Sequence, residues 1–202
     1  PVAADAPGAP ASAAQPSAAQ AAALSRDARR IHALSRDKLL QIRTLLRTSN
    51  TQASIGSGFF VSADGLIVTN FHVASQLALE PERYRGVYVT IDGQEGDVDL
   101  LAFDVQHDVA VLRTRQRTAP APVLEFRPAA EPLAQGERIY SLGNPLDIGF
   151  AVTEGTYNGL VRRSFYPRIF FGGTLNPGMS GGPAVDDAGR VLGVNVAKRL
   201  DG

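Results

Sequence analysis

The 202-residue chain carries 20 basic and 20 acidic side chains, so its zero formal charge gives no electrostatic reason to expect a nucleic acid or an acidic membrane as partner. The composition, 44% hydrophobic and 20% charged, is that of an ordinary globular protein, and no apolar run approaches the roughly 18 residues that a membrane helix needs. Cysteine is absent, which excludes disulfides, thiolate metal sites and a cysteine nucleophile.

Two segments are predicted at the N-terminus. Residues 1–23 are almost entirely Ala, Pro, Ser, Gln and Gly, which predicts a disordered or semi-stiff linker, and they show no signal-peptide pattern. Residues 24–40 place apolar side chains at helical spacing opposite a row of arginines, which predicts a helix. We expect this helix to pack on the domain, and an oligomerising helix is the alternative. Its expected apolar face consists of Leu24, Ala28, Ile31, Ser35 and Leu39.

From residue 41 onward, short β-type runs alternate with turns. Glycine-bearing turns at 63–65 and 187–189 each predict a hairpin, and the proline-rich stretch 118–132 divides the strands into two groups. Many short strands with few helices indicate an all-β architecture of two lobes, over residues 41–117 and 133–202. The expected strands are 41–48, 55–62, 66–71, 87–91, 98–103, 109–113, 138–142, 150–161, 183–186 and 191–197.

Ser180 lies between glycines, in the run GMSGG at 178–182. Such glycines allow a sharp turn that presents the hydroxyl to a cleft, and they let backbone N–H groups converge on one point as an oxyanion hole. A flexible glycine-rich turn would explain the pattern about as well. The run also matches the Gly-x-Ser-x-Gly elbow of α/β-hydrolases, but there the histidine follows the serine, and none of the 22 residues after Ser180 is a histidine.

A histidine base would therefore lie upstream, and the chain has three histidines. His32 lies among arginines in the expected helix, and His107 lies at a strand entrance, so a surface position is the simplest expectation for both. His72 follows the apolar strand 66–71, where a lone histidine is most often structural. Its neighbours change that expectation when all the motifs are considered together.

Four motifs together resemble the HtrA/Deg branch of the chymotrypsin-like serine proteases. They are GSGFFV (56–61) followed by DGLIVTNFHV (64–73), then HDVAVL (107–112), LGNP (142–145) and NPGMSGGP (176–183), in the family's order over roughly residues 41–199. The resemblance implies two antiparallel six-stranded β-barrels of the chymotrypsin type with the active site between them. It also implies a serine endopeptidase that acts on extended or unfolded polypeptide segments and needs no metal or other cofactor.

The resemblance also assigns the site. Ser180 would be the nucleophile, His72 its general base and Asp108 the acid that orients the imidazole, in a Ser-His-Asp triad that forms an acyl-enzyme. The N–H groups of Gly178 and Ser180 would form the oxyanion hole. Thr174 stands where trypsin-type enzymes place a specificity acid, so we expect cleavage after small or aliphatic residues. The other expected pocket residues are Val196, Ala197 and Lys198.

Three features depart from the family pattern. The connections near 49–53 and 163–168 are short, which argues against regulation through long loops there. Val196 stands where relatives often carry a Thr or Ser whose hydroxyl supports the triad acid. The sequence stops at Gly202, where relatives continue with a strand, so we expect the second barrel to lack its last strand and residues 1–202 alone to have little or no activity.

A function of another class stays open, namely a latent or inactive binding module that keeps the protease fold. The Ala- and Pro-rich lead resembles the tether of bacterial envelope proteases, which predicts a periplasmic or otherwise extracytoplasmic location. The expected partners are polypeptide substrates, with no nucleic acid and no integral membrane segment in this chain. A homo-oligomer formed through the N-terminal helix is a further possible partner.

Overall fold

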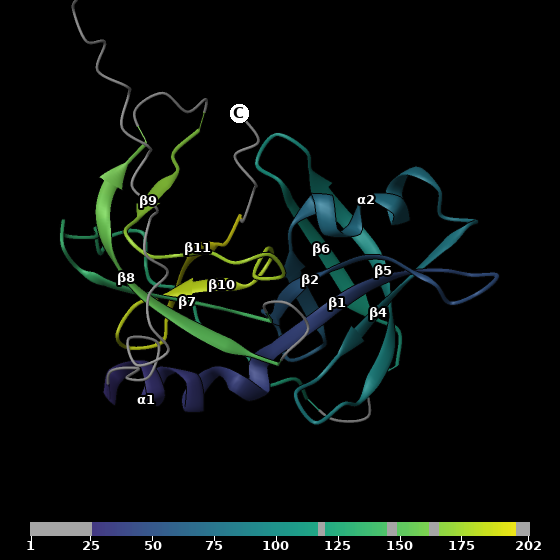
Figure 1. The fold of residues 1–202 in the computed structure, drawn as a ribbon, viewed down its shortest axis with the longest axis horizontal. Helices are drawn as coiled ribbons and strands as arrows, with labels where there is room; N and C mark the ends of the chain where they lie inside the picture. Colours follow the sequence, from purple (N-terminus) through teal and green to yellow (C-terminus); the bar gives the residue numbers. More distant parts are fainter. Residues whose placement is uncertain (1–25, 117–119, 145–148, 162–165, 197–202) are drawn as a thin grey trace, which may run out of the picture.

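A computed structural model describes residues 26–116, 120–144, 149–161 and 166–196. Two β-structures lie side by side, with one helix beneath the second structure and another above the first (Figure 1). The first part contains α1 (Arg26–Ser35), a 3-10 turn η1 (Arg36–Lys38), β1 (Leu39–Leu46), β2 (Gln52–Phe60), β3 (Leu66–Thr69), α2 (Phe71–Leu79), β4 (Tyr84–Val89), β5 (Glu95–Asp104) and β6 (Val109–Thr114). The second part contains β7 (Arg138–Gly143), β8 (Ala151–Leu160), β9 (Ile169–Phe171), β10 (Pro183–Val185) and β11 (Val191–Val194).

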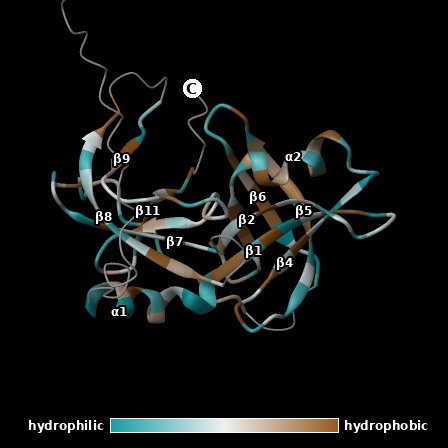
Figure 2. Cartoon of the chain, viewed as in Figure 1, coloured by the Kyte–Doolittle hydropathy of each residue, from teal (hydrophilic) through white to brown (hydrophobic). Residues whose placement is uncertain are grey.

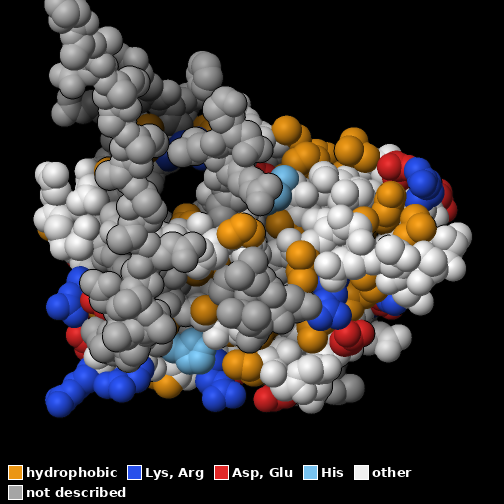
Figure 3. Space-filling model, in the orientation of Figure 1, with side chains coloured by type: hydrophobic (Ala, Val, Ile, Leu, Met, Phe, Trp, Pro, Cys, Tyr) orange, Lys and Arg blue, Asp and Glu red, His pale blue; other side chains and the backbone are white. Residues whose placement is uncertain are grey.

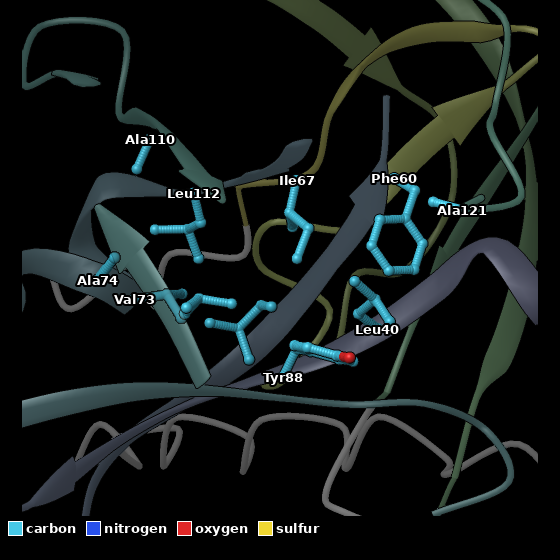
Figure 4. Close-up of a cluster of buried hydrophobic side chains, with 11 residues drawn as sticks. Leu40, Phe60, Ile67, Val73, Ala74, Tyr88, Ala110, Leu112 and Ala121 are labelled. Atoms are coloured by element: carbon cyan, nitrogen blue, oxygen red, sulfur yellow. The ribbon is translucent and has the colours of Figure 1, made fainter. Parts of the chain in front are cut away.

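The first β-structure is a closed antiparallel barrel with the strand order β1-β2-β3-β6-β5-β4. Its strands alternate inward and outward side chains; in β6, for example, Ala110, Leu112 and Thr114 are buried. The barrel is filled by a cluster of apolar side chains to which α2 contributes Val73 and Ala74 (Figure 4). The other members are Leu40, Ile42, Phe60, Ile67, Tyr88, Val98, Ala110, Leu112 and Ala121.

The second β-structure is a sheet with the order β11-β10-β7-β8-β9. Helix α1 lies against β7 and β8 and buries Ala28 and Ile31 completely. Leu39 of β1 and Phe59 of β2 reach out of the first barrel into this second core, so the two parts share apolar packing. Figure 2 shows the hydrophobic residues concentrated along the strands, whereas α1 is largely hydrophilic.

The structure confirms the expected fold of the chymotrypsin type, with a closed first barrel and a curled second sheet of five strands among the described residues. Both expected hairpins are present, because β2 pairs with β3 and β10 pairs with β11. No helix in the described part of the chain is long and apolar enough to cross a membrane.

Several expectations were wrong in detail. The N-terminal helix ends at Ser35, and Leu39 belongs to β1, because η1 turns the chain from the helix into the barrel. The expected strand 66–71 ends at Thr69, and the undetected helix α2 follows, so His72 lies in the first turn of a helix. The three-residue strand β9 was also missed.

The two histidines expected on the surface differ from each other. His107 is exposed, as expected. His32 is instead half-buried, and its Nε2 lies 3.2 Å from the carbonyl oxygen of Phe150. This contact exists because the helix face that carries His32 packs against the second sheet, which helical spacing alone does not reveal.

Candidate active site

His72 and Asp108 form a close pair at the edge of the first barrel. The Nδ1 atom of His72 lies 2.8 Å from Oδ2 of Asp108, and the backbone N–H of His72 donates to Oδ1 at 2.9 Å. The Asp108 side chain is only 8% exposed, whereas the His72 side chain is 42% exposed. Because an ionised carboxylate only accepts hydrogen bonds, Nδ1 of the neutral imidazole carries the proton and Nε2 is left as the acceptor.

The backbone of Asp108 adopts a left-handed conformation, with φ at 55°. Asp and Asn tolerate this region better than other residues that carry a side chain. Two donors at the start of α2 hold the Asp108 carbonyl: Nδ2 of the fully buried Asn70 at 2.8 Å and the N–H of Phe71 at 3.2 Å. The side chain of Asn70 therefore supports the acid instead of capping the helix.

A second His–Asp pair lies on the turn just before Asp108. His107 donates its backbone N–H to Oδ1 of Asp104 at 3.0 Å, and its Nδ1 lies 2.6 Å from Oδ2. These hydrogen bonds lower the pKa of the Asp104 carboxyl below its ordinary value. Both side chains are about half exposed. The His107 ring also lies 4.6 Å from the ring of Tyr166. This pair has the hydrogen-bond pattern of the first one but lies in solvent.

Two consecutive β-turns share Met179, and Ser180 lies in the second of them. In the turn 176–179, the N–H of the fourth residue donates to the first carbonyl at 3.1 Å, and Gly178 at the third position has a φ of 91°. In the turn 179–182, the N–H of Gly182 donates to the carbonyl of Met179 at 3.0 Å, and Gly181 at the third position has a φ of 87°. A positive φ at the third position defines a type II turn and favours glycine there. The glycines expected from the sequence thus place Ser180 at the second position of a tight turn that directly follows another.

The Ser180 turn packs directly against the segment that leads into His72. A Cβ atom on Gly181 would overlap the carbonyl oxygen of Ser57 and would lie 3.0 Å from the backbone nitrogen of Asn70. Only glycine permits this approach, because no larger residue leaves space for the neighbouring backbone. Asn70 is two residues from His72, so this contact brings the nucleophile turn to the start of α2.

A second close approach lies on the other side of Ser180. A Cβ atom on Gly56 would lie 2.5 Å from Cγ2 of Val73 and 3.0 Å from the carbonyl oxygen of Ser180. Gly56 thus touches both the residue after His72 and the main chain of Ser180. The structure therefore brings all three expected triad residues into one region, from α2, the β5–β6 turn and the loop before β10.

A cavity of about 390 Å³ lies beside the loop that leads to Ser180. Val196 lines this cavity, whereas Thr174 is exposed and is not among its lining residues. Ala197 and Lys198 lie outside the described residues. The other lining residues include Leu175, Ile169, Phe171, Ala184, Leu192 and Val194, which make one wall of the cavity mainly apolar.

Sequence reasoning did not single out Ser57 or Asn70, both of which are buried at this site. Both lie inside the quoted motifs, Ser57 between two glycines and Asn70 two residues before His72. Their position in the motifs was the only hint in the sequence that they matter. Their roles could not be read from it, because they bind main-chain atoms of segments far away along the chain.

Comparison with known proteins settles the family. Residues 56–194 match the family described as "Trypsin-like peptidase domain". The chain belongs to this family. The match covers β2 to β11 and includes every expected triad residue, so it confirms the resemblance that the motifs indicated.

The curated relatives of this trypsin-like domain are of the HtrA/Deg type. A "Probable periplasmic serine endoprotease DegP-like" of Halomonas elongata is 34% identical over 152 residues, which covers 73% of this chain and 30% of the relative. "Protease Do-like 1, chloroplastic" of Arabidopsis thaliana is 33% identical over 157 residues, covering 70% of this chain and 33% of that protein. The chain thus spans about a third of the length of these relatives.

Among solved structures, the crystal structure of Deg5 superposes with a TM-score of 0.75 at 24% identity. The alignment covers 86% of this chain and 87% of the Deg5 chain. At this identity the likeness shows a shared fold and does not by itself establish an activity.

Proposed function

We propose that this trypsin-like domain is a serine endopeptidase with Ser180 as nucleophile, His72 as general base and Asp108 as orienting acid. The observation that carries the proposal is the His72–Asp108 pair, whose hydrogen bonds leave the imidazole Nε2 as an acceptor, on a helix whose start packs against the Ser180 turn. An acceptor nitrogen next to a serine in a glycine-rich turn is what nucleophilic activation of a hydroxyl requires.

The reaction follows from these positions. Ser180 Oγ attacks the carbonyl carbon of the scissile peptide bond while Nε2 of His72 takes the hydroxyl proton, giving a tetrahedral intermediate. The imidazolium, stabilised by the Asp108 carboxylate, then gives that proton to the leaving amine as the C–N bond breaks. Water attacks the resulting acyl-enzyme in the same way, with His72 again accepting and returning a proton.

The N–H groups of Gly178 and Ser180 are the proposed donors to the tetrahedral oxyanion. The positive φ of Gly178 supports this role. It marks a type II turn, in which the peptide that carries the Gly178 N–H points opposite to its direction in a type I turn. Loss of one such donor typically costs about 2.7–4 kcal/mol of barrier.

Apolar surface beside His72 supports unfolded or extended polypeptides as substrates. Phe71, the residue before His72, stacks on Phe103 with ring centroids 4.8 Å apart. Phe103 is 50% exposed, and two further apolar side chains of the same strand and turn, Leu101 and Val105, are exposed too. Figure 3 shows hydrophobic side chains gathered on this face next to an exposed histidine. Unfolded segments offer apolar side chains to such a surface, whereas folded proteins bury most of theirs.

The mainly apolar wall of the cavity beside the Ser180 loop supports cleavage after small or aliphatic residues. An extracytoplasmic location is proposed from the printed name of the periplasmic relative, although the chloroplastic relative shows that location varies within the family. The alternative of an inactive binding module is not favoured, because a binding module has no need of a buried carboxylate held against an exposed imidazole.

Hydrolysis of a fluorescently labelled, permanently unfolded protein tests this function. We expect the protein, at the length in which it occurs naturally, to release peptides, and we expect Ser180→Ala to reduce that rate by several orders of magnitude without loss of fold. Ser49→Ala is the matched control, because Ser49 is an exposed serine in the β1–β2 turn. Equal rates for the parent protein and Ser180→Ala would reject the proposal, and binding without hydrolysis in the parent would favour the binding module.

A further inference from the structure

Ser57 of β2 lies at the centre of the candidate site but has no role in the mechanism above. It is 1% exposed and makes four hydrogen bonds to three separate segments of the chain. A buried polar side chain with a full set of partners restricts the positions of all the groups it binds.

Two of these bonds reach the nucleophile turns. The backbone N–H of Ser57 donates to the carbonyl of Ser180 at 2.7 Å, and its hydroxyl donates to the carbonyl of Gly178 at 2.7 Å. Gly178 and Ser180 are the same two residues whose N–H groups are the proposed oxyanion donors. One residue of the first barrel thus holds the carbonyl of each proposed donor residue.

The remaining bonds fix Ser57 itself. Its hydroxyl oxygen accepts the backbone N–H of Asn144 at 2.8 Å, and its carbonyl accepts the hydroxyl of Thr69 at 2.7 Å. Because the Asn144 N–H can only donate, the single hydroxyl proton of Ser57 is committed to Gly178. Close packing leaves little freedom, since a Cβ atom on Gly143 would come within 3.0 Å of the Ser57 hydroxyl oxygen.

The turn that contains Gly178 needs such a restraint. Glycine adopts positive and negative φ about equally readily, so the turn 176–179 can change between type II and type I at low cost. That change inverts the peptide that carries the Gly178 N–H. The peptide that follows Gly178 is held at both ends, its carbonyl by Ser57 and its N–H, that of Met179, by the carbonyl of Asn176.

We propose that Ser57 is a positioning residue that keeps the oxyanion-binding turn in its catalytic conformation. The inference rests on the proposed function, because it assigns Ser57 to the transition state of that reaction. Ser57 touches neither substrate nor reacting atoms, and it acts through Gly178 and Ser180.

The test compares Ser57→Ala with the parent protein at equal concentrations of active sites, well below the unfolding temperature. Ser57→Ala keeps the backbone bond to Ser180 but removes the bond to Gly178. We expect kcat to fall about 10- to 100-fold, less than the 10²–10³-fold typical of deleting a donor, with KM changed less than about twofold. Affinity for a peptide boronic acid, which forms a tetrahedral adduct, falls by the same factor as kcat. The midpoint of the pH–rate profile stays unchanged, because the His72–Asp108 pair is untouched.

Ser141→Ala is the matched control. Ser141 of β7 is equally buried, at 1% exposure, and its hydroxyl has no hydrogen-bond partner in the described part of the chain. We expect unchanged kcat and boronate affinity for this variant. Ser57→Cys, which fills the space with a weaker donor, gives an intermediate kcat and provides the comparison if Ser57→Ala does not fold.

Amide exchange gives a readout that does not depend on turnover. If Ser57 holds the turn, the exchange rate of the Gly178 amide, whose peptide the turn change inverts, differs from the parent in Ser57→Ala and not in Ser141→Ala. A parent protein without any hydrolysis would contradict the proposed function. If the parent is active and Ser57→Ala leaves kcat, boronate affinity and Gly178 exchange unchanged, the role of Ser57 alone is overturned. A variant that changes only KM would overturn it too.

Discussion

Replacing Asp108 with asparagine tests the orientation of His72 with little change to the fold. The left-handed backbone at Asp108, with φ at 55°, suits asparagine as well as aspartate. The amide has one acceptor and one donor group, and the two groups of His72 that face it decide its orientation. The backbone N–H of His72 can only donate, so the amide oxygen must take the place of Oδ1, now 2.9 Å from that nitrogen.

The amide NH₂ of Asp108→Asn then faces Nδ1, where the carboxylate oxygen now lies at 2.8 Å. Nδ1 must become the acceptor, so Nε2 carries the proton and cannot take one from Ser180. A wrong tautomer of this kind lowers kcat by about 10⁴-fold, which is roughly 5 kcal/mol of barrier. We expect kcat/KM for a peptide substrate at neutral pH to fall by that amount, with the melting temperature nearly unchanged.

Asp104→Asn is the control, because Asp104 makes the same pair of contacts to His107 in solvent. We expect its kcat/KM to stay within about twofold of the parent, as for most exposed substitutions. If kcat/KM falls less than tenfold in Asp108→Asn, or falls equally in both variants, the reasoning on the tautomer of His72 is refuted.

Three further predictions concern packing, pH and specificity. Gly181→Ala should destabilise the fold by more than about 2 kcal/mol in urea unfolding and abolish activity. The reason is that Gly181 has a φ of 87° and that an added Cβ would overlap the carbonyl oxygen of Ser57. A stable, active variant would contradict this. Hydrogen bonding from Arg127 lowers the pKa of Glu137 below its ordinary value of 4.5, so its stabilising contribution is complete above that pH and is lost as pH falls through the lowered pKa. Glu137→Gln should therefore have a free energy of unfolding about 1 kcal/mol lower at neutral pH, and it should lose less stability than the parent on acidification. If the unfolding free energies of the two proteins fall in parallel from pH 7 to pH 3, the prediction is wrong. A peptide library should show small or aliphatic residues before the cleaved bond, and dominant Arg or Lys there would be the contrary result.

Most of the fold was predictable because the barrel strands carry a strong local signal. The alternation in β6 and the glycine turns of both hairpins are visible without any tertiary contact. Helix α2 was missed because its first residues continue the apolar run of β3, and the change of structure after Thr69 depends on a contact to Asp108. The strand β9 has only three residues, and its pairing with β8 is interrupted by a register shift, so it shows no sustained period.

The candidate site divides in a similar way. Ser180, His72 and Asp108 could be proposed from the sequence because each lies within a recognisable local motif. Asn70 and Ser57 act by binding carbonyl groups 38 and 121 residues away along the chain, and no local pattern reports such a contact. The expected pocket residues stay predictions, because counting back from the nucleophile to Thr174 does not show which way the loop turns, and Thr174 is exposed.

Covalent labelling tests most directly whether Ser180 is a nucleophile activated by His72. The protein is incubated with a fluorophosphonate, digested, and analysed by mass spectrometry to locate the phosphonylated residue. We predict one adduct, on Ser180, formed far more slowly in His72→Ala and absent in Ser180→Ala. An adduct on another serine, or equal labelling of Ser180 with and without His72, would contradict the proposed active site.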